Sequence, residues 1–262
     1  MCLILLSFKR HSRYPVILAA NRDEFYERPS APVTFWDDAP DILAGRDMKD
    51  GGTWLGITRK GRIAAITNYR DPASIKDDAP SRGWLVRDYL YGTEDPAAYL
   101  EKIARRADQY NAFNLIAGDA SQLYYFSNRD FPTRGRIKAL PPGLYGLSNH
   151  LLDTSWPKVE RGKAALASLL AGKEKPDPEE IFSILSDRSR PDDDRLPDTG
   201  VGLEWERILS AMFIVSPVYG TRSSTVLMID RKDCVILAER VYNCHPEAWM
   251  TAKYGFRIQR DR

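Results

Sequence analysis

The sequence predicts an α+β fold in which helices cover sheets of mainly antiparallel strands. Strand patterns open the chain, two helices follow, and strands, helices and strands then alternate to its end. Most consecutive strand patterns are separated by connectors of hairpin length, and hairpins join antiparallel neighbours. With about ten strands and several helices, layers of helices on sheets are the expected packing.

The predicted strands are apolar runs bounded by turn residues. Residues 2–8 form an apolar run that is typical of a strand buried on both faces, and a polar connector joins it to a second run at residues 16–20. Two further runs flank Lys60-Gly61 as a hairpin candidate. The full set of predicted strands is residues 2–8, 16–20, 54–58, 62–69, 113–117, 123–126, 137–140, 144–148, 212–215, 223–230 and 235–241.

Helices are predicted from apolar periodicity and end signals. Ser81 and Ser155 are the expected N-caps of the first and third helices, and Pro96 opens the second. The charged segment 187–202 contains many helix breakers and is expected to be a mobile loop. The predicted helices are residues 83–91, 96–107, 156–171 and 178–185, with a short helical turn at 204–209.

Length and composition favour a single domain over residues 1–262. Lys+Arg (38) and Asp+Glu (36) nearly cancel, so the net charge of +2 indicates neither a nucleic-acid partner nor an anionic membrane. No apolar run reaches the roughly 18 residues of a membrane span, and the N-terminus lacks the basic flank of a signal peptide. With only three cysteines and no disulfide pattern, we expect a cytoplasmic protein.

Cys2 is the first candidate for chemistry. If Met1 is removed, the thiol and the α-amine of the chain lie on one residue, with pKa values near ~8.5 and ~7.7, so the amine can act as the base for the thiol. N-terminal nucleophile enzymes use this arrangement to attack a carbonyl carbon. The alternative is a small buried residue that opens a core strand.

A polar cluster is expected beside Cys2. If the first two strands pair with Phe8 opposite Pro15, then Cys2 faces Asn21, at the start of Asn21-Arg22-Asp23-Glu24. Asp23 or Glu24 would orient the terminal ammonium, and Arg22 would lower the pKa of the thiol or hold an acidic group of a substrate. Alternatively, the cluster is a solvated turn with a local Arg–Asp pair.

Two asparagines and one arginine complete the candidate set. Asn68 ends a predicted strand and Asn149 follows another, and a side-chain amide near a nucleophile can donate to an oxyanion. Each is also a common turn former. Arg222, at the start of a strand, either faces solvent or pairs with a carboxylate such as Asp23.

Several motifs together resemble one known family, the transport and Golgi organisation family, also called the NRDE family. The resemblance covers nearly the whole chain in the expected order. Its motifs are Met1-Cys2, Asn21-Arg22-Asp23-Glu24-Phe25, Gly51-Gly52-Thr53-Trp54-Leu55-Gly56, Thr67-Asn68-Tyr69, Asn114-Leu115-Ile116, Tyr145-Gly146-Leu147-Ser148-Asn149 and Tyr219-Gly220-Thr221-Arg222.

The resemblance implies a four-layer αββα sandwich similar to the N-terminal nucleophile hydrolases, including the cysteine hydrolases of bile-salt conjugates and penicillins. It also implies a set of catalytic residues and a set of substrate-binding residues that neighbour them. The expected catalytic residues are Cys2, Asp23, Asn68, Asn149 and Arg222. The expected substrate-binding residues are Asn21, Arg22, Glu24, Tyr69 and His150. In those hydrolases the first arginine lies three residues before the aspartate, whereas Arg22 directly precedes Asp23.

Three functions are consistent with these residues. The first is an amidohydrolase that cleaves a small acyl amide with Cys2, needs no cofactor and requires removal of Met1. The second, which the resemblance implies, is a non-catalytic carrier of a hydrophobic cargo, either haem or an acyl thioester. The third is a structural or interaction role, although nothing in the sequence marks a partner groove. Cys234, Cys244 and His245 do not match zinc-ligand spacing, so no metal is expected.

Overall fold

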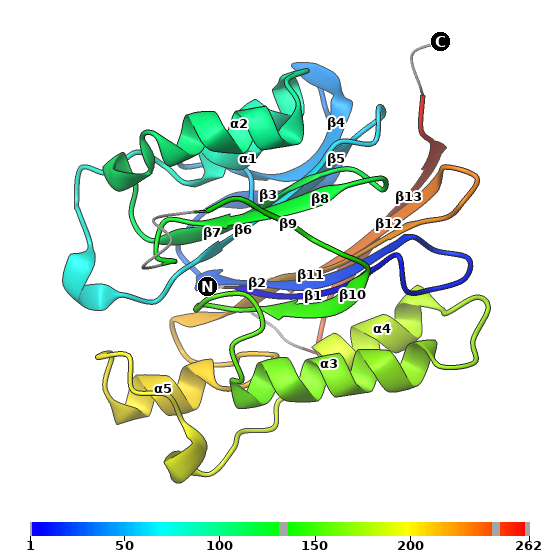
Figure 1. Cartoon of the computed structure of the whole chain (residues 1–262). Coiled ribbons are helices and arrows are strands. Elements are labelled where there is room, and N and C mark those ends of the chain that lie inside the picture. The colour runs from blue at the N-terminus through cyan, green and yellow to red at the C-terminus, as the bar shows by residue number, and fades with distance from the viewer. Residues whose placement is uncertain (1, 131–135, 243–246, 260–262) are drawn as a thin grey trace.

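The computed structural model describes residues 2–130, 136–242 and 247–259. It has four layers in the order helices, sheet, sheet, helices (Figure 1). Every strand pair in the described residues is antiparallel. The α+β sandwich of two antiparallel sheets flanked by helices, expected from the sequence, is therefore confirmed.

The two sheets contain strands that are far apart in the sequence. Sheet A has the order β10-β1-β2-β11-β12-β13, and sheet B has the order β3-β4-β5-β6-β7-β8-β9. The strands of sheet A are β10 (Gly143–Leu147), β1 (Cys2–Phe8), β2 (Val16–Phe25), β11 (Tyr219–Ile229), β12 (Cys234–Val241) and β13 (Met250–Arg257). Those of sheet B are β3 (Ser30–Trp36), β4 (Ala39–Asp47), β5 (Leu55–Thr58), β6 (Ile63–Asn68), β7 (Phe113–Gly118), β8 (Leu123–Ser127) and β9 (Lys138–Ala139).

Helices α1 (Gly83–Tyr91) and α2 (Pro96–Ala104) bury apolar faces against the outer side of sheet B. Helices α3 (Pro157–Leu170) and α4 (Pro178–Leu185) cover sheet A in the same way, and α5 (Leu203–Leu209) lies at the end of the sandwich where β1 begins (Figure 1). None of the helices in the described part of the chain is long and apolar enough to cross a membrane.

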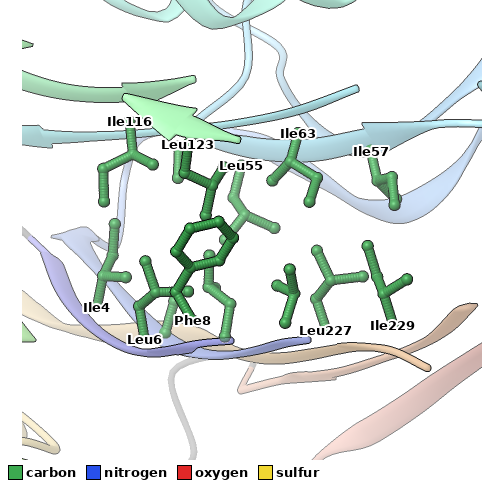
Figure 2. Close-up of a cluster of buried hydrophobic side chains, with 14 of the residues drawn as sticks. Ile4, Leu6, Phe8, Leu55, Ile57, Ile63, Ile116, Leu123, Leu227 and Ile229 are labelled. Atoms are coloured by element: carbon green, nitrogen blue, oxygen red, sulfur yellow. The ribbon is translucent and has the colours of Figure 1, made fainter. Parts of the chain in front are cut away.

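A dry core joins the two sheets. Figure 2 shows Ile4, Leu6 and Leu227 of sheet A pointing toward Leu55 and Ile63 of sheet B. All five side chains are at most 4% exposed. Alternate residues of β1, such as Leu3 and Leu5, face the helices instead, as the two-residue period of a strand requires. Both faces of β1 are thus buried, which explains the continuous apolar run of residues 2–8.

The first hairpin differs from the predicted register by one residue. Phe8 pairs with Val16 rather than Pro15, so Cys2 lies opposite Arg22 rather than Asn21. The shift arises in the turn, where Lys9 adopts a positive φ of 52° and its amide donates to the carbonyl of Pro15 over 2.7 Å. Because side chains alternate across a strand, this shift places Arg22 on the same face as Cys2.

Several predicted elements are wrong. β3, β4 and β13 are missing from the predicted strands. β3 and β4 contain prolines, and the residues of β13 are half-exposed or exposed, as the edge positions of β3 and β13 allow. Residues 212–215 form no strand, only a bridge between Val215 and Gly220. Neither Ser81 nor Ser155 is an N-cap. The N-cap residues of α1 and α3 are Arg82 and Trp156, and neither makes a side-chain capping hydrogen bond. The segment 187–202 contains a 3₁₀ helix at Asp193–Arg195.

Candidate functional site

A cleft of about 210 Å³ opens at the start of β1. Its walls come from β1 and β2, from the connection between β4 and β5, and from the segment that leads into α1. Four of its lining residues are acidic and three are arginines, so it is a strongly polar site. The lining residues are Cys2, Arg22, Asp23, Glu24, Arg28, Asp47, Asp50, Thr53, Trp54, Ile66, Asn68, Ala79, Pro80, Ser81, Arg82, Gly83 and Asn111.

Cys2 and Arg22 are direct neighbours across β1 and β2. The guanidinium of Arg22 lies over the Trp54 ring, 4.2 Å from its centroid, and Arg22 is only 6% exposed. Its one side-chain hydrogen bond among the described residues is a long one, 3.4 Å to Ser30 Oγ. Burial raises the pKa of the Cys2 thiol and the Asp23 carboxylate adds to this, whereas Arg22 favours the thiolate.

Asp23 lines the cleft and is 1% exposed. Thr221, its partner on β11, donates a hydrogen bond of 2.7 Å from Oγ1 to Asp23 Oδ1. Burial raises the pKa of this carboxyl group, while the charge of Lys158 and the Thr221 bond work in the opposite direction. Asp23 is therefore a desolvated acid whose ionisation depends on its neighbours.

Glu24 has the opposite balance. Burial raises its pKa, but the backbone N–H of Phe25, which donates to Glu24 Oε1 over 3.0 Å, and the charges of Arg22 and Arg28 hold the pKa below its usual value. Arg28 itself bridges Asp50 (2.7 Å) and Asp47 (3.2 Å from Nε). One wall of the cleft is thus a fixed ionic network, with Glu24 as a carboxylate at neutral pH.

The two predicted asparagines are adjacent but have different surroundings. Asn68 ends β6 and lines the cleft. Asn149 is fully buried, and its Nδ2 donates to the backbone carbonyl of Asn68 over 2.9 Å. Ser148, the residue before it, donates from Oγ to the carbonyl of Cys2. The structure therefore places Asn149 behind Asn68, where its amide ties sheet A to β6.

Two predicted site residues point away from the cleft. Asn21 lies on the face of β2 that meets the helices, where Nδ2 donates to the carbonyls of Leu185 and Met212, each over 2.8 Å, and Oδ1 accepts from Ser224. Arg222 occupies a bulge in β11, and its NH1 donates to the carbonyls of residues 25, 26 and 28. The predicted pairing of Arg222 with Asp23 is wrong, because Thr221 makes that contact.

Tyr69 and His150 form a pair beside the cleft. Tyr69 lines an adjoining pocket of about 190 Å³ that shares Asn68, Arg82 and Asn111 with the cleft. Because Thr154 donates its hydroxyl proton to Leu151, His150 Nδ1 must donate to Thr154 Oγ1 and Nε2 must accept from the Tyr69 hydroxyl, both over 2.8 Å. Burial lowers the pKa of His150, consistent with this neutral ring.

Sequence reasoning missed three cations of the site, of which Arg28 is described above. Arg82, just before α1, reaches the cleft and donates to the carbonyl of Ala112 over 2.9 Å. Lys158 approaches Asp23 from α3 and is 2% exposed. Helical spacing could have identified Lys158, since it shares one stripe with Gly162 and Leu166, which are both buried.

No cluster of potential metal ligands is present among the described residues. Haem does not fit the histidines found there, because both ring nitrogens of His11 and of His150 are already in hydrogen bonds. Cys244 and His245 lie outside the described residues.

Among solved structures, the fold is similar to those of an acid amidase and a bile acid hydrolase. An N-acylethanolamine-hydrolyzing acid amidase ortholog from Caenorhabditis elegans matches with a TM-score of 0.52 and 11% identity, over 86% of this chain and 92% of that chain. A conjugated bile acid hydrolase from Clostridium perfringens matches with a TM-score of 0.50 and 10% identity, over 100% and 99%. The class of fold that this chain shares with these neighbours is the N-terminal nucleophile hydrolase-like sandwich.

Within that class, the chain belongs to the Transport and Golgi organisation 2 family, whose model matches residues 1–244. The homologue from Bos taurus is 39% identical over 99% of this chain and 100% of its own length. The Homo sapiens homologue is 36% identical over the same shares. A Drosophila melanogaster relative is 27% identical over 89% of both chains. The resemblance to the NRDE family is therefore confirmed.

Proposed function

We propose that this protein is an N-terminal cysteine amidohydrolase that cleaves a C–N bond in a small acyl amide. One observation carries the proposal: Cys2 opens β1 in a polar cleft, with Arg22, Asp23 and Asn68 around it. A cysteine needed only for packing would favour apolar neighbours. Here it lies among charged groups that change its pKa.

In the proposed reaction, Met1 is first removed, so that the α-amine of Cys2 is free. The sulfur attacks the carbonyl carbon and the amine takes the thiol proton. The C–N bond then breaks and that proton passes to the leaving amine, which leaves a thioester on Cys2. Water attacks the thioester, the acid leaves, and the sulfur regains a proton.

Each polar neighbour has a role in this scheme. The Asn68 amide donates to the oxyanion, and Asn149 holds the Asn68 backbone in place through its 2.9 Å bond. Asp23 orients the α-amine. Arg22 and Arg82 make no ion pair with a carboxylate among the described residues, so they are available to an acidic group of the substrate. Arg222 acts indirectly, by fixing the turn that follows Glu24.

A second candidate is a non-catalytic carrier of an acyl thioester, supported by the adjoining pocket. That pocket includes apolar residues beside Asn68, among them Pro72, Ile75 and Val201, where an acyl chain could lie. Haem is a less supported cargo, because the ring nitrogens of the described histidines already take part in hydrogen bonds.

The test compares three chains: the wild type, Cys2→Ala and the control Cys234→Ala, which removes the exposed free cysteine. Each is treated with an activated acyl ester and analysed by intact mass and N-terminal sequencing. We expect one acyl adduct on Cys2, only in chains that lack Met1, and amide turnover reduced roughly 10³-fold or more by Cys2→Ala. Unchanged labelling in Cys2→Ala would falsify the proposal, and a stable adduct without turnover would favour the carrier.

A further inference from the structure

Lys158 is a fully buried lysine that the proposed reaction does not use. It lies in the first turn of α3 and is 2% exposed. Its Nζ donates to the backbone carbonyl of Leu209 over 2.9 Å, its one hydrogen bond among the described residues. An ammonium group has three donors and prefers water, so this position is unfavourable for a charge.

The place of Lys158 in the helix is also unfavourable for a positive charge. The N-terminal end of a helix carries a partial positive charge, which repels a cation in the first turn. Burial lowers the pKa of Lys158 to about 8. A neutral side chain could fill the same space beside Leu209 at less cost. Buried charges that break local rules in this way are typical of functional sites.

The charges around Lys158 show which group it serves. The charges of Asp23 of β2, Cys2 of β1 and Glu206 of α5 act to raise the pKa of Lys158, and that of Arg70 acts to lower it. Arg70 and Glu206 form a direct ion pair with each other, with both side chains 3% exposed. Glu206 also accepts from the amide (2.9 Å) and hydroxyl (2.6 Å) of Thr199. Glu206 is therefore already satisfied.

Asp23 is the carboxylate with the largest effect on Lys158, since its charge raises the pKa of the lysine more than that of Glu206 does. Lys158 bonds to Leu209, which packs with Ile214 in one buried cluster. The amide of Ile214 donates to Thr221 Oγ1, the hydroxyl that donates to Asp23. Both Lys158 and Asp23 are at least 98% buried. In such a desolvated region, charges interact strongly without direct contact. Among the side chains around Asp23, Thr221 donates to it, whereas Glu24, on the same strand, opposes its ionisation. The charge of Asp23 also acts to raise the pKa values of Tyr219 and Arg70.

We propose that Lys158 is a positioning residue of the Cys2 site, which lies in the helix layer over sheet A and keeps Asp23 ionised. This inference rests on the proposed function in one respect only, that the ionised Asp23 orients the α-amine of Cys2. The charge coupling itself does not depend on catalysis.

The coupling is measured by NMR with ¹³Cγ-labelled aspartate, using Asp23→Asn to assign the Asp23 signal. The variants are Lys158→Met, which keeps the length of the side chain, and Lys158→Arg, which keeps its charge. Lys163→Met, on the same helix, is the control, because Lys163 pairs with Asp153 instead. We expect Lys158→Met to move the Asp23 titration up by roughly one pH unit or more, and the other two to leave it in place. An unmoved Asp23 titration in folded Lys158→Met overturns the inference.

The reciprocal experiment covers the case in which Lys158→Met fails to fold. Coupling between two sites is mutual, so Asp23→Asn must move the Lys158 titration below its wild-type value, measured with ¹³Cε-labelled lysine. A Lys158 titration that stays in place in Asp23→Asn contradicts the inference.

Catalysis is a separate readout. If both proposals hold, the acid limb of the pH profile for Cys2 acylation moves to higher pH in Lys158→Met and is unchanged in Lys163→Met. A moved Asp23 titration without any Cys2 acylation refutes the proposed function alone. Acylation with an unmoved Asp23 titration refutes the role of Lys158 alone.

Discussion

Glu239 is a buried acid between the two sheets. It lies on β12 and is 1% exposed, and its Oε2 accepts a hydrogen bond of 2.7 Å from the amide of Val33 on β3. Burial raises its pKa to about 7, although the Val33 amide and the charge of Arg22 favour the ionised form. Glu239 therefore links the electrostatics of the cleft to the stability of the sandwich.

This pKa predicts how stability depends on pH. Below the usual value of 4.5, Glu239 is protonated in both the folded and the unfolded chain. As the pH rises from about 4.5 to 7, the unfolded chain ionises first, so the folded state loses up to about 3 kcal/mol. Glu239→Gln should remove this loss, as measured by urea unfolding at several pH values. Glu101→Gln, at an exposed position, is the control, and equal pH slopes for wild type and Glu239→Gln would contradict the prediction.

At the scale of elements, the position of α1 depends on close contact between two glycines. A Cβ atom added to Gly52 would lie 2.6 Å from the backbone carbon of Gly83, the first residue of α1. The Thr53 amide also donates to the Gly83 carbonyl over 3.2 Å. This contact positions the neighbouring residues Trp54 and Arg82, which both line the cleft, and it explains Gly52, whereas Gly51 is explained by its positive φ of 69°.

Gly52→Ala should therefore disturb both stability and the site. We expect a loss of about 1–3 kcal/mol, because the added methyl group meets backbone atoms that cannot move aside singly. Weaker acylation of Cys2 should follow from the displacement of Arg82. Thermal unfolding and the acyl-labelling rate measure the two effects. Gly255→Ala is a matched control, since the nearest atom to its Cβ is 3.8 Å away. A Gly52→Ala protein as stable and reactive as Gly255→Ala would refute this account.

For the whole molecule, the core between the sheets predicts that they unfold together. Leu227 of sheet A and Leu55 of sheet B belong to one buried cluster, and Leu227 is 0% exposed. Separation of the two sheets would expose this cluster to water. The single domain expected over residues 1–262 stays a prediction, and this cluster provides its test.

Leu227→Ala should lower the free energy of unfolding by about 2–5 kcal/mol through the cavity it creates. The transitions seen by far-UV and near-UV circular dichroism in urea should move together and remain coincident. Leu203→Ala, at a half-exposed position on α5, is the control with little expected change. Two separate transitions, of which only one responds to Leu227→Ala, would show that the sheets belong to different folding units.

Much of this fold follows from local pattern. Apolar runs and short connectors identify β1, β2, β5 and β6, and the first hairpin brings Cys2 to the segment 21–24 with an error of one residue. These features are predictable because strand period and hairpin length act over a few residues. The edge strands β3 and β13 escape such patterns, because an edge strand tolerates proline and polar residues. β4 lies between β3 and β5, and it escapes because Pro40 and Asp41 near its start are typical of a turn.

The sequence by itself determined the class of fold, the family and the meeting of Cys2 with Arg22 and Asp23. Only the tertiary structure decided which polar residues share that cleft. It turned Asn21 toward the helices, placed Asn149 behind Asn68, and brought Arg82 and Lys158 to the site from distant segments. The physical reason is that a buried polar group takes the partner that packing brings within reach. That partner depends on which surfaces meet, and no local pattern specifies it.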